Sequence, residues 1–259
     1  DVAVTSPDGE THNTTCGFNL GKPMAIQASL PQVFVPGECK AAVKVTRYDG
    51  KDAAVAVNYV VSSVSTPLYS GEGDLLGVAE SDGAEGSKPV VKEIKRGAVD
   101  GTDFAQVLSS LPSGCYRVEF STADSTLAEP VTSGDVVVYR RTDTDCPVNT
   151  MLWLPEGDEK LYADESGRAE IVFGTAIDKP HVLLTLSDEA GQPVDMRWVD
   201  GRKGMNRVAV TLPAGNLMGR VRLDIVKDMH RAGASVELCA PSTRAAITLT
   251  TETFRDKVT

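Results

Sequence analysis

Histidine, aromatic residues and long apolar runs are all scarce in this sequence. The 259 residues include three histidines, and aromatic residues make up 5% of the chain. No run of about eighteen apolar residues occurs, so we expect no membrane-spanning helix. No positively charged start precedes an apolar core, so we expect no signal peptide either.

The sequence patterns that mark catalytic and cofactor sites are also missing. No G-x-S-x-G turn accompanies His12, His181 and His230, so we interpret them as structural, with His181 beginning a strand and His230 in a turn. Neither a phosphate-binding loop nor a G-x-G-x-x-G segment occurs, which leaves nucleotide binding without support. We therefore predict no enzymatic activity, no catalytic residue, no metal and no cofactor.

The five cysteines do not form a metal-binding pattern. No C-x-x-C pair and no Cys/His ligand spacing occurs, which disfavours a zinc site. Because the number is odd, at least one thiol stays free, although Cys39 and Cys115 are a conceivable disulfide pair. We expect most of the cysteines to be small core or strand residues. They are Cys16, Cys39, Cys115, Cys146 and Cys239.

A surplus of acidic residues narrows the range of partners. The net charge is −10 and the isoelectric point is about 4.8. Nucleic acid needs a basic surface to neutralise its phosphates, and anionic lipid headgroups need one too. We expect neither partner, and we interpret the charge as favouring solubility.

The hydrophobic pattern of the sequence has a period of two. Apolar and polar residues alternate in short runs, as in strands with one buried face, and turn sequences such as Pro7-Asp8-Gly9 and Pro112-Ser113-Gly114 separate the runs. This pattern predicts an all-β fold of antiparallel β-sandwiches. One short helix is expected at Asp103–Leu111, ending before Pro112. The alternating runs are residues 24–30, 116–120, 169–173, 182–186, 208–212 and 221–225.

The length suits two modules in tandem. A polar, proline-bearing stretch at residues 140–149 marks the expected boundary between them. The ends look cut, so we expect a fragment of a longer protein. The expected parts are a terminal hairpin of a preceding module at 1–21, a first sandwich at 22–142, a second at 143–245, and a linker or following module at 246–259.

Two acidic segments are candidates for cation binding. Asp143 and Asp145 form a D-x-D pair in the expected linker, where calcium could stiffen a junction. The rest of a calcium loop is missing, so a solvated polar linker is the preferred interpretation. Residues 70–89 are interpreted as a long exposed loop, although a protease-accessible bait is an alternative. This loop holds the second acidic group, Asp74, Glu80, Asp82 and Glu85.

Aromatic residues offer a candidate carbohydrate platform. Trp153 and Trp198, together with Tyr59, Tyr69 and Tyr162, could stack against sugar rings. Both tryptophans fall in strand patterns, so core packing is the preferred interpretation.

Several segments resemble one known family. Leu111–Val118, LPSGCYRV, resembles the strand entry of macroglobulin domains in bacterial α2-macroglobulin-like proteins. Leu249–Val258, LTTETFRDKV, resembles a junction in the large members from Bacteroidetes-type bacteria. Asp8–Thr11 and Glu170–Thr175 lie where that family has similar strands. The resemblance covers most of the chain in order.

The resemblance implies a parent built of many sandwich domains, secreted or attached to the outer membrane in the periplasm. Complete members trap proteases, often with a thioester in a C-x-E-Q motif, and no cysteine here matches that motif. We therefore expect a non-catalytic piece of the scaffold. Its partners would be neighbouring domains of the parent and, through the full-length protein, proteases, with no direct membrane contact. The alternative is an adhesin or glycan-binding module of a surface protein.

Overall fold

The chain is an all-β protein, as the alternation predicted. The computed structural model describes residues 2–5, 7–14, 22–65, 90–99, 103–155, 160–227 and 230–241. Within these ranges, strands β1 to β18 carry nearly all of the regular structure, and α1 (Ala105–Ser109) lies inside the helix predicted at Asp103–Leu111. No helix in the described ranges is long and apolar enough to cross a membrane.

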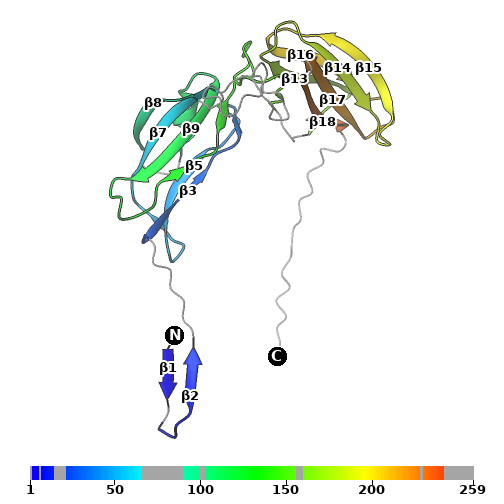
Figure 1. Cartoon of the computed structure of the whole chain (residues 1–259). Helices are drawn as coiled ribbons and strands as arrows, with labels where there is room; N and C mark the ends of the chain where they lie inside the picture. Colours follow the sequence, from blue (N-terminus) through cyan, green and yellow to red (C-terminus); the bar gives the residue numbers. More distant parts are fainter. Residues whose placement is uncertain are drawn as a thin grey trace, which may run out of the picture.

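The first sandwich packs a small sheet against a larger one (Figure 1). The small sheet contains β3 (Met24–Ser29), β5 (Ala42–Arg47) and β6 (Asp52–Ala53). The larger sheet has the order β4 (Val33–Phe34), β11 (Val136–Val138), β9 (Gly114–Thr122), β7 (Val57–Ser65) and β8 (Val90–Val99), and β10 (Val131–Thr132) also pairs with β9.

The core of the first sandwich is centred on aromatic rings. Phe104 contacts Phe120 edge to face at a centroid distance of 5.0 Å, and Tyr59 contacts Phe104 in the same way at 5.3 Å. All three side chains are buried. Burial of the alternate residues of β7 and β9 explains why their sequences read as strands with one apolar face.

The second sandwich has the same general construction (Figure 1). Its larger sheet has the order β12 (Leu161–Tyr162), β18 (His230–Cys239), β17 (Met218–Lys227), β14 (His181–Ser187) and β15 (Pro193–Asp200). Its smaller sheet pairs β13 (Arg168–Thr175) with β16 (Gly204–Thr211). The core between them includes the inward-facing β14 residues Val182, Leu184 and Leu186.

A separate hairpin precedes the first sandwich. β1 (Val2–Thr5) and β2 (Thr11–Thr14) pair antiparallel with Val2 opposite Thr14, around the predicted Pro7-Asp8-Gly9 turn. Gly9 has a φ of +88°, a conformation that this turn requires and that glycine adopts without strain. The assignment of this hairpin to a preceding module remains a prediction.

Two separate hydrophobic cores serve the two sandwiches. One draws its buried residues from positions 26–138 and the other from positions 151–238. The exact module boundary between residues 142 and 143 stays a prediction. The loop assigned to residues 70–89, including its acidic group and Tyr69, lies outside the described residues, as do Cys16 and the segment 246–259.

Candidate functional site: the junction between the sandwiches

The chain between β11 and Trp153 forms a small hydrophobic cluster that both sandwiches share. Tyr139, which directly follows β11, is 1% exposed and packs with Val172 of β13 and Met205 of β16. Its ring meets the Trp153 ring edge to face at a centroid distance of 5.4 Å. Half-buried Val33 and Val35 of the first sandwich complete the cluster. The sandwiches are therefore joined by packed side chains as well as by the chain.

Trp153 is fixed to the second sandwich by backbone hydrogen bonds. Its N–H donates to the Gly174 carbonyl at 2.9 Å, and the Gly174 N–H donates to the Trp153 carbonyl at 2.8 Å. A side chain at Gly174 would not fit, because its Cβ would lie 2.5 Å from the Cys146 sulfur. The close approach allows the indole and Cys146 to cover the end of the β13–β16 sheet.

Arg140 connects the junction to the first sandwich. Its guanidinium donates to the Ser109 and Leu111 carbonyls at 3.0 and 2.8 Å and to the Ser113 hydroxyl at 3.1 Å. These carbonyls lie at the last residue of α1 and two residues beyond it, where backbone acceptors lack helical partners. The arginine supplies the missing donors and holds the 109–113 segment against the linker.

Asp143 has a structural partner in this linker. Its carboxylate accepts a hydrogen bond from the Arg140 N–H at 2.7 Å, while the Asp143 N–H donates to the Arg140 carbonyl at 2.9 Å. This closes a tight turn at Arg140–Asp143. Among the described residues no group of three or more His, Cys, Asp or Glu side chains is arranged to hold a metal ion.

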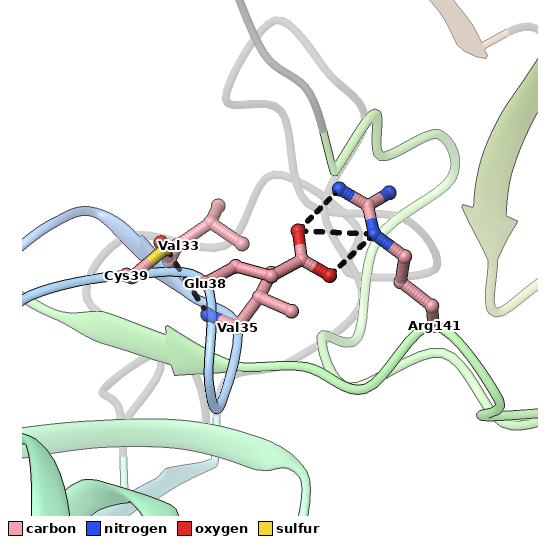
Figure 2. Close-up of polar contacts among 5 residues, drawn as sticks. All are labelled: Val33, Val35, Glu38, Cys39 and Arg141. Atoms are coloured by element: carbon pink, nitrogen blue, oxygen red, sulfur yellow. Dashed lines mark hydrogen bonds and ion pairs between the residues drawn. The ribbon is translucent and has the colours of Figure 1, made fainter.

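A bidentate ion pair crosses from the linker to the β4–β5 loop of the first sandwich. Figure 2 shows the Arg141 guanidinium on the Glu38 carboxylate, with hydrogen bonds of 2.7 and 2.8 Å. These hydrogen bonds hold the pKa of Glu38 below its usual value, because they outweigh the opposing effect of desolvation. Both side chains are about half exposed, so the pair fixes an orientation and adds little to stability.

The other side of the linker docks on β16 of the second sandwich. The Met205 N–H donates to the Thr144 carbonyl at 2.8 Å, and Arg207 donates to the Arg141 carbonyl. Arg207 also pairs with Glu170 at 3.1 Å. The linker therefore has polar contacts on both sides, which supplement the hydrophobic cluster around Tyr139.

A cavity of about 630 Å³ lies at this junction. Its wall combines β7 and β9 of the first sandwich with the linker and the second sandwich, and it carries hydroxyl, thiol, amide, carboxylate and ammonium groups. The lining residues are Ser63–Ser65, Ser113–Tyr116, Asp145–Asn149, Thr175, Ala176, Lys203 and Gly204. None is a histidine that could activate a hydroxyl or thiol as a general base.

Two cysteines of the cavity wall, Cys115 and Cys146, are held as neutral thiols. Desolvation by burial raises the pKa of each to about 11. The thiolate is the nucleophilic form of cysteine, so these groups are weak nucleophiles at neutral pH. The geometry therefore suits packing at an interface better than covalent chemistry.

We expect Cys115 and Cys146 to resist alkylation in the folded protein. At pH 7.5, iodoacetamide should modify each at least about 100-fold more slowly than a free cysteine, because the thiolate fraction falls with the raised pKa. Mass spectrometry of timed digests measures the rates, and the unfolded chain is the control in which both react. Rapid labelling of either thiol in the folded protein would contradict its assigned environment.

The structure separates several residues that the sequence had grouped. Cys39 is a free thiol whose sulfur accepts from the Val35 N–H at 3.4 Å and donates to the Val33 carbonyl at 3.7 Å (Figure 2). Cys115 is also free, so the conceivable Cys39–Cys115 disulfide is wrong. The remaining described cysteines, Cys146 and Cys239, are free as well.

The histidines lie in strands. His181 begins β14 as predicted and pairs with Asp200 at 3.2 Å on the surface. His230 begins β18, so its assignment to a turn is wrong. His12 belongs to β2. The registers of β14–β15 and β17–β18 decide these positions, placing His181 opposite Asp200 and His230 opposite Lys227.

Among the described residues, Tyr59, Trp153 and Trp198 do not gather in one platform. Tyr59 is in the core and Trp153 is half-buried at the junction, in agreement with the packing interpretation. Trp198 is 66% exposed, so the prediction that it packs in a core is wrong. It lies on edge strand β15, where the second sheet of the sandwich does not cover its face.

The fold and the junction define a protein of two tandem β-sandwiches whose strands pair mainly antiparallel, with parallel pairs at β4–β11 and β12–β18. No protein-family model and no curated protein matches the chain. Solved structures with similar folds include Escherichia coli α2-macroglobulin in its native form, at 15% identity and a TM-score of 0.24, with 83% of this chain and 17% of that chain covered. The elastase-activated form matches at 14% identity and a TM-score of 0.26, with 92% and 24% covered.

A titin immunoglobulin tandem, A164–A165, is similar over 85% of this chain and 97% of its own length, at 8% identity and a TM-score of 0.26. The chain thus spans less than a quarter of the α2-macroglobulin structures and nearly the whole titin pair. At these identities and TM-scores the similarities carry no argument about function.

Proposed function

We propose that this chain is a non-catalytic structural unit that holds two β-sandwiches in a fixed relation within a larger extracytoplasmic protein. The observation that carries the proposal is the shared cluster around Tyr139, whose side chain is 1% exposed between the two sandwiches. A flexible linker would leave such a ring in water, because it would make no lasting contacts with either domain.

The polar contacts support the same function. Arg140 and Arg141 bind the first sandwich, while the Thr144 and Arg141 carbonyls accept hydrogen bonds from β16 of the second. Each contact is weak by itself, but together they restrain the linker along its length. A unit restrained in this way fixes the orientation of one sandwich relative to the other.

The proposed parent is an α2-macroglobulin-like protein of the cell envelope, which as a whole would inhibit proteases. The support is the resemblance of Leu111–Val118 to macroglobulin domains. In the structure this segment takes part in the junction, since Leu111 and Ser113 accept hydrogen bonds from Arg140. The Tyr116 hydroxyl closes the segment by donating to the Pro112 carbonyl at 2.8 Å.

Nuclear magnetic resonance relaxation of the isotope-labelled chain tests the proposal. We expect the backbone amides of both sandwiches to report one rotational correlation time, that of a single body that contains both sandwiches. Amides in β7 and β9 represent the first sandwich, and amides in β14 and β17 the second. Two shorter and unequal correlation times would show that the sandwiches tumble independently and would refute the proposed function.

One observation favours a second candidate, a glycan-binding or adhesive module. Trp198 is 66% exposed and could stack on a sugar ring. The other exposed aromatic residue among those described, Tyr48, is 68% exposed but lies in the first sandwich, beyond the end of β5. Specific binding on a glycan array that Trp198→Ala removes would favour this candidate over the structural one.

A further inference from the structure

Edge strand β15 carries an apolar stripe that faces water. Val194, Met196 and Trp198 occupy every second position and are 45%, 60% and 66% exposed, and Val194 lies at a β-bulge where the register with β14 shifts. β15 is the last strand of its sheet, and no other strand of the described residues pairs with its outer edge. Such an edge is a template for pairing with another strand, and tryptophan and methionine are enriched in interfaces.

The opposite face of the same strand carries charges. Asp195 and Arg197 lie between the apolar positions, with an Arg197 nitrogen 3.4 Å from an Asp195 oxygen. Arg197 also donates to the Ala209 carbonyl of β16, which places its guanidinium at the open rim between the two sheets. The side chains of Asp195 and Arg197 are 38% and 46% exposed, so both can reach a partner.

The apolar row and the charged row of β15 each match the same row of a second copy of the strand. If two β15 strands run antiparallel about a twofold axis at Met196, Val194 of each copy lies opposite Trp198 of the other, and Met196 meets Met196. On the second face Asp195 lies opposite Arg197 in both directions. Directly opposed side chains in antiparallel strands are about 4.5–5.5 Å apart at Cβ, so apolar residues meet apolar residues and each carboxylate meets a guanidinium.

Neighbouring registers lack this match. An axis at Asp195 or at Arg197 brings like charges together on the axis. An axis between two residues sets the apolar row of one copy against the charged row of the other. Like charges directly opposed destabilise strand pairs, and a one-residue shift exchanges the faces. The charge pattern therefore selects one occupant and one register.

We propose that β15 is a homotypic docking edge, which pairs antiparallel with β15 of a second copy of this chain about a twofold axis at Met196. The two five-stranded sheets then join into one continuous sheet. The interface is isologous, because the same surface serves both copies. This inference goes beyond the proposed function, since it concerns an edge outside the junction and is independent of the rigidity of the linker.

Charge reversal tests the register. Analytical ultracentrifugation from about 1 to 500 µM should show reversible dimers of the unmodified chain, since an interface of one strand pair belongs to the small, weak class. Asp195→Arg and Arg197→Asp should each weaken dimerisation at least about tenfold, because each creates two like-charge pairs. The double variant D195R/R197D should restore it.

Mixing the two single variants provides the most discriminating result. Asp195→Arg mixed with Arg197→Asp should form a heterodimer, since every opposed pair then carries opposite charges. Glu165→Arg, a reversal at an exposed turn elsewhere in the second sandwich, is the matched control and should dimerise as the unmodified chain does. Circular dichroism confirms that each variant is folded. A monomeric unmodified chain, or a dimer insensitive to both single reversals, would overturn the proposal.

A cysteine at the axis gives an independent measurement. Met196→Cys should form a covalent dimer under mild oxidation, because opposed strand residues lie about 4.5–5.5 Å apart at Cα, within disulfide range. Tyr48→Cys, equally exposed but in the first sandwich, is the control and should stay monomeric on a non-reducing gel. Equal cross-linking of both variants would show random collision and would refute the docking edge.

Discussion

Replacing Tyr139 with alanine is expected to destabilise the junction by about 3–5 kcal/mol, the range for truncating a buried aromatic residue. The ring is 1% exposed, contacts Trp153 edge to face and packs on Val172 and Met205. Its loss leaves a cavity between the sandwiches. Since each sandwich keeps its own core, we expect both to stay folded but to tumble with separate correlation times and to unfold in separate calorimetric transitions.

Tyr48→Ala is the matched control for this change. Tyr48 is 68% exposed, and its truncation should alter the free energy of unfolding by no more than about 0.5 kcal/mol. Tyr139→Ala would then differ from it in both stability and tumbling. If the two variants gave the same melting profile and the same correlation times, the cluster around Tyr139 would not couple the sandwiches, and the observation that carries the proposed function would fail.

Replacing Gly204 with alanine is expected to displace the linker from β16. Gly204 has a φ of +103°, and a Cβ there would lie 2.2 Å from the Thr144 carbonyl oxygen. The neighbouring hydrogen bond from the Met205 N–H to the same oxygen would then break or lengthen. Backbone strain, overpacking and the lost hydrogen bond together should cost about 3–5 kcal/mol. Urea unfolding measures the loss, and the Met205 amide shift locates it.

Gly215→Ala separates the clash from the backbone strain. Gly215 has a φ of +90°, close to that of Gly204, but no atom lies within 4 Å of its Cβ position. Its replacement should therefore cost only the strain of about 1–2 kcal/mol and leave the Met205 amide shift unchanged. Equal losses for the two glycines would mean that the linker does not press against β16 at Thr144.

The alternation of apolar and polar residues predicted the strands that have one buried face and one more exposed face. In β9, Tyr116, Val118 and Phe120 are buried and alternate with more exposed residues, so the period of two is visible in the sequence. The same holds for β14 and β17. The helix at Ala105–Ser109 was predicted because apolar residues at helical spacing precede Pro112.

The pattern was less informative for β15. Val194, Met196 and Val199 suggest a strand with apolar residues on both faces, and Trp198 favoured a core position. A sequence pattern records which residues share a face but does not say whether another sheet covers that face. Trp198 lies opposite Leu183 of β14, on the face of the sheet away from the core residues Val182 and Leu184, and the smaller sheet packs on the other face. The exposure of Trp198 could therefore be seen only in the structure.

The junction, too, was only partly predictable from the sequence. Its contact residues are separated by long stretches of sequence: Glu38 meets Arg141, Arg140 meets Ser109 to Ser113, and Tyr139 meets Met205. The polar stretch at 140–149 suggested a boundary, and the signal for a packed joint was weak, since Tyr139 alone extends the apolar strand into it. Asp143 was a candidate cation ligand by its D-x-D spacing, with a solvated polar linker preferred, and only the fold shows that its carboxylate closes a turn.

The sequence by itself determined that this chain is an all-β protein without a recognisable catalytic motif. Strand alternation, turn residues and the missing motifs are local properties that act within a few residues of each other. The tertiary structure alone decided that the linker is a packed joint and that β15 presents its apolar stripe to water. Both features depend on which distant segments come together, and that is set by the pairing of sheets and the closing of long loops, which no local pattern encodes.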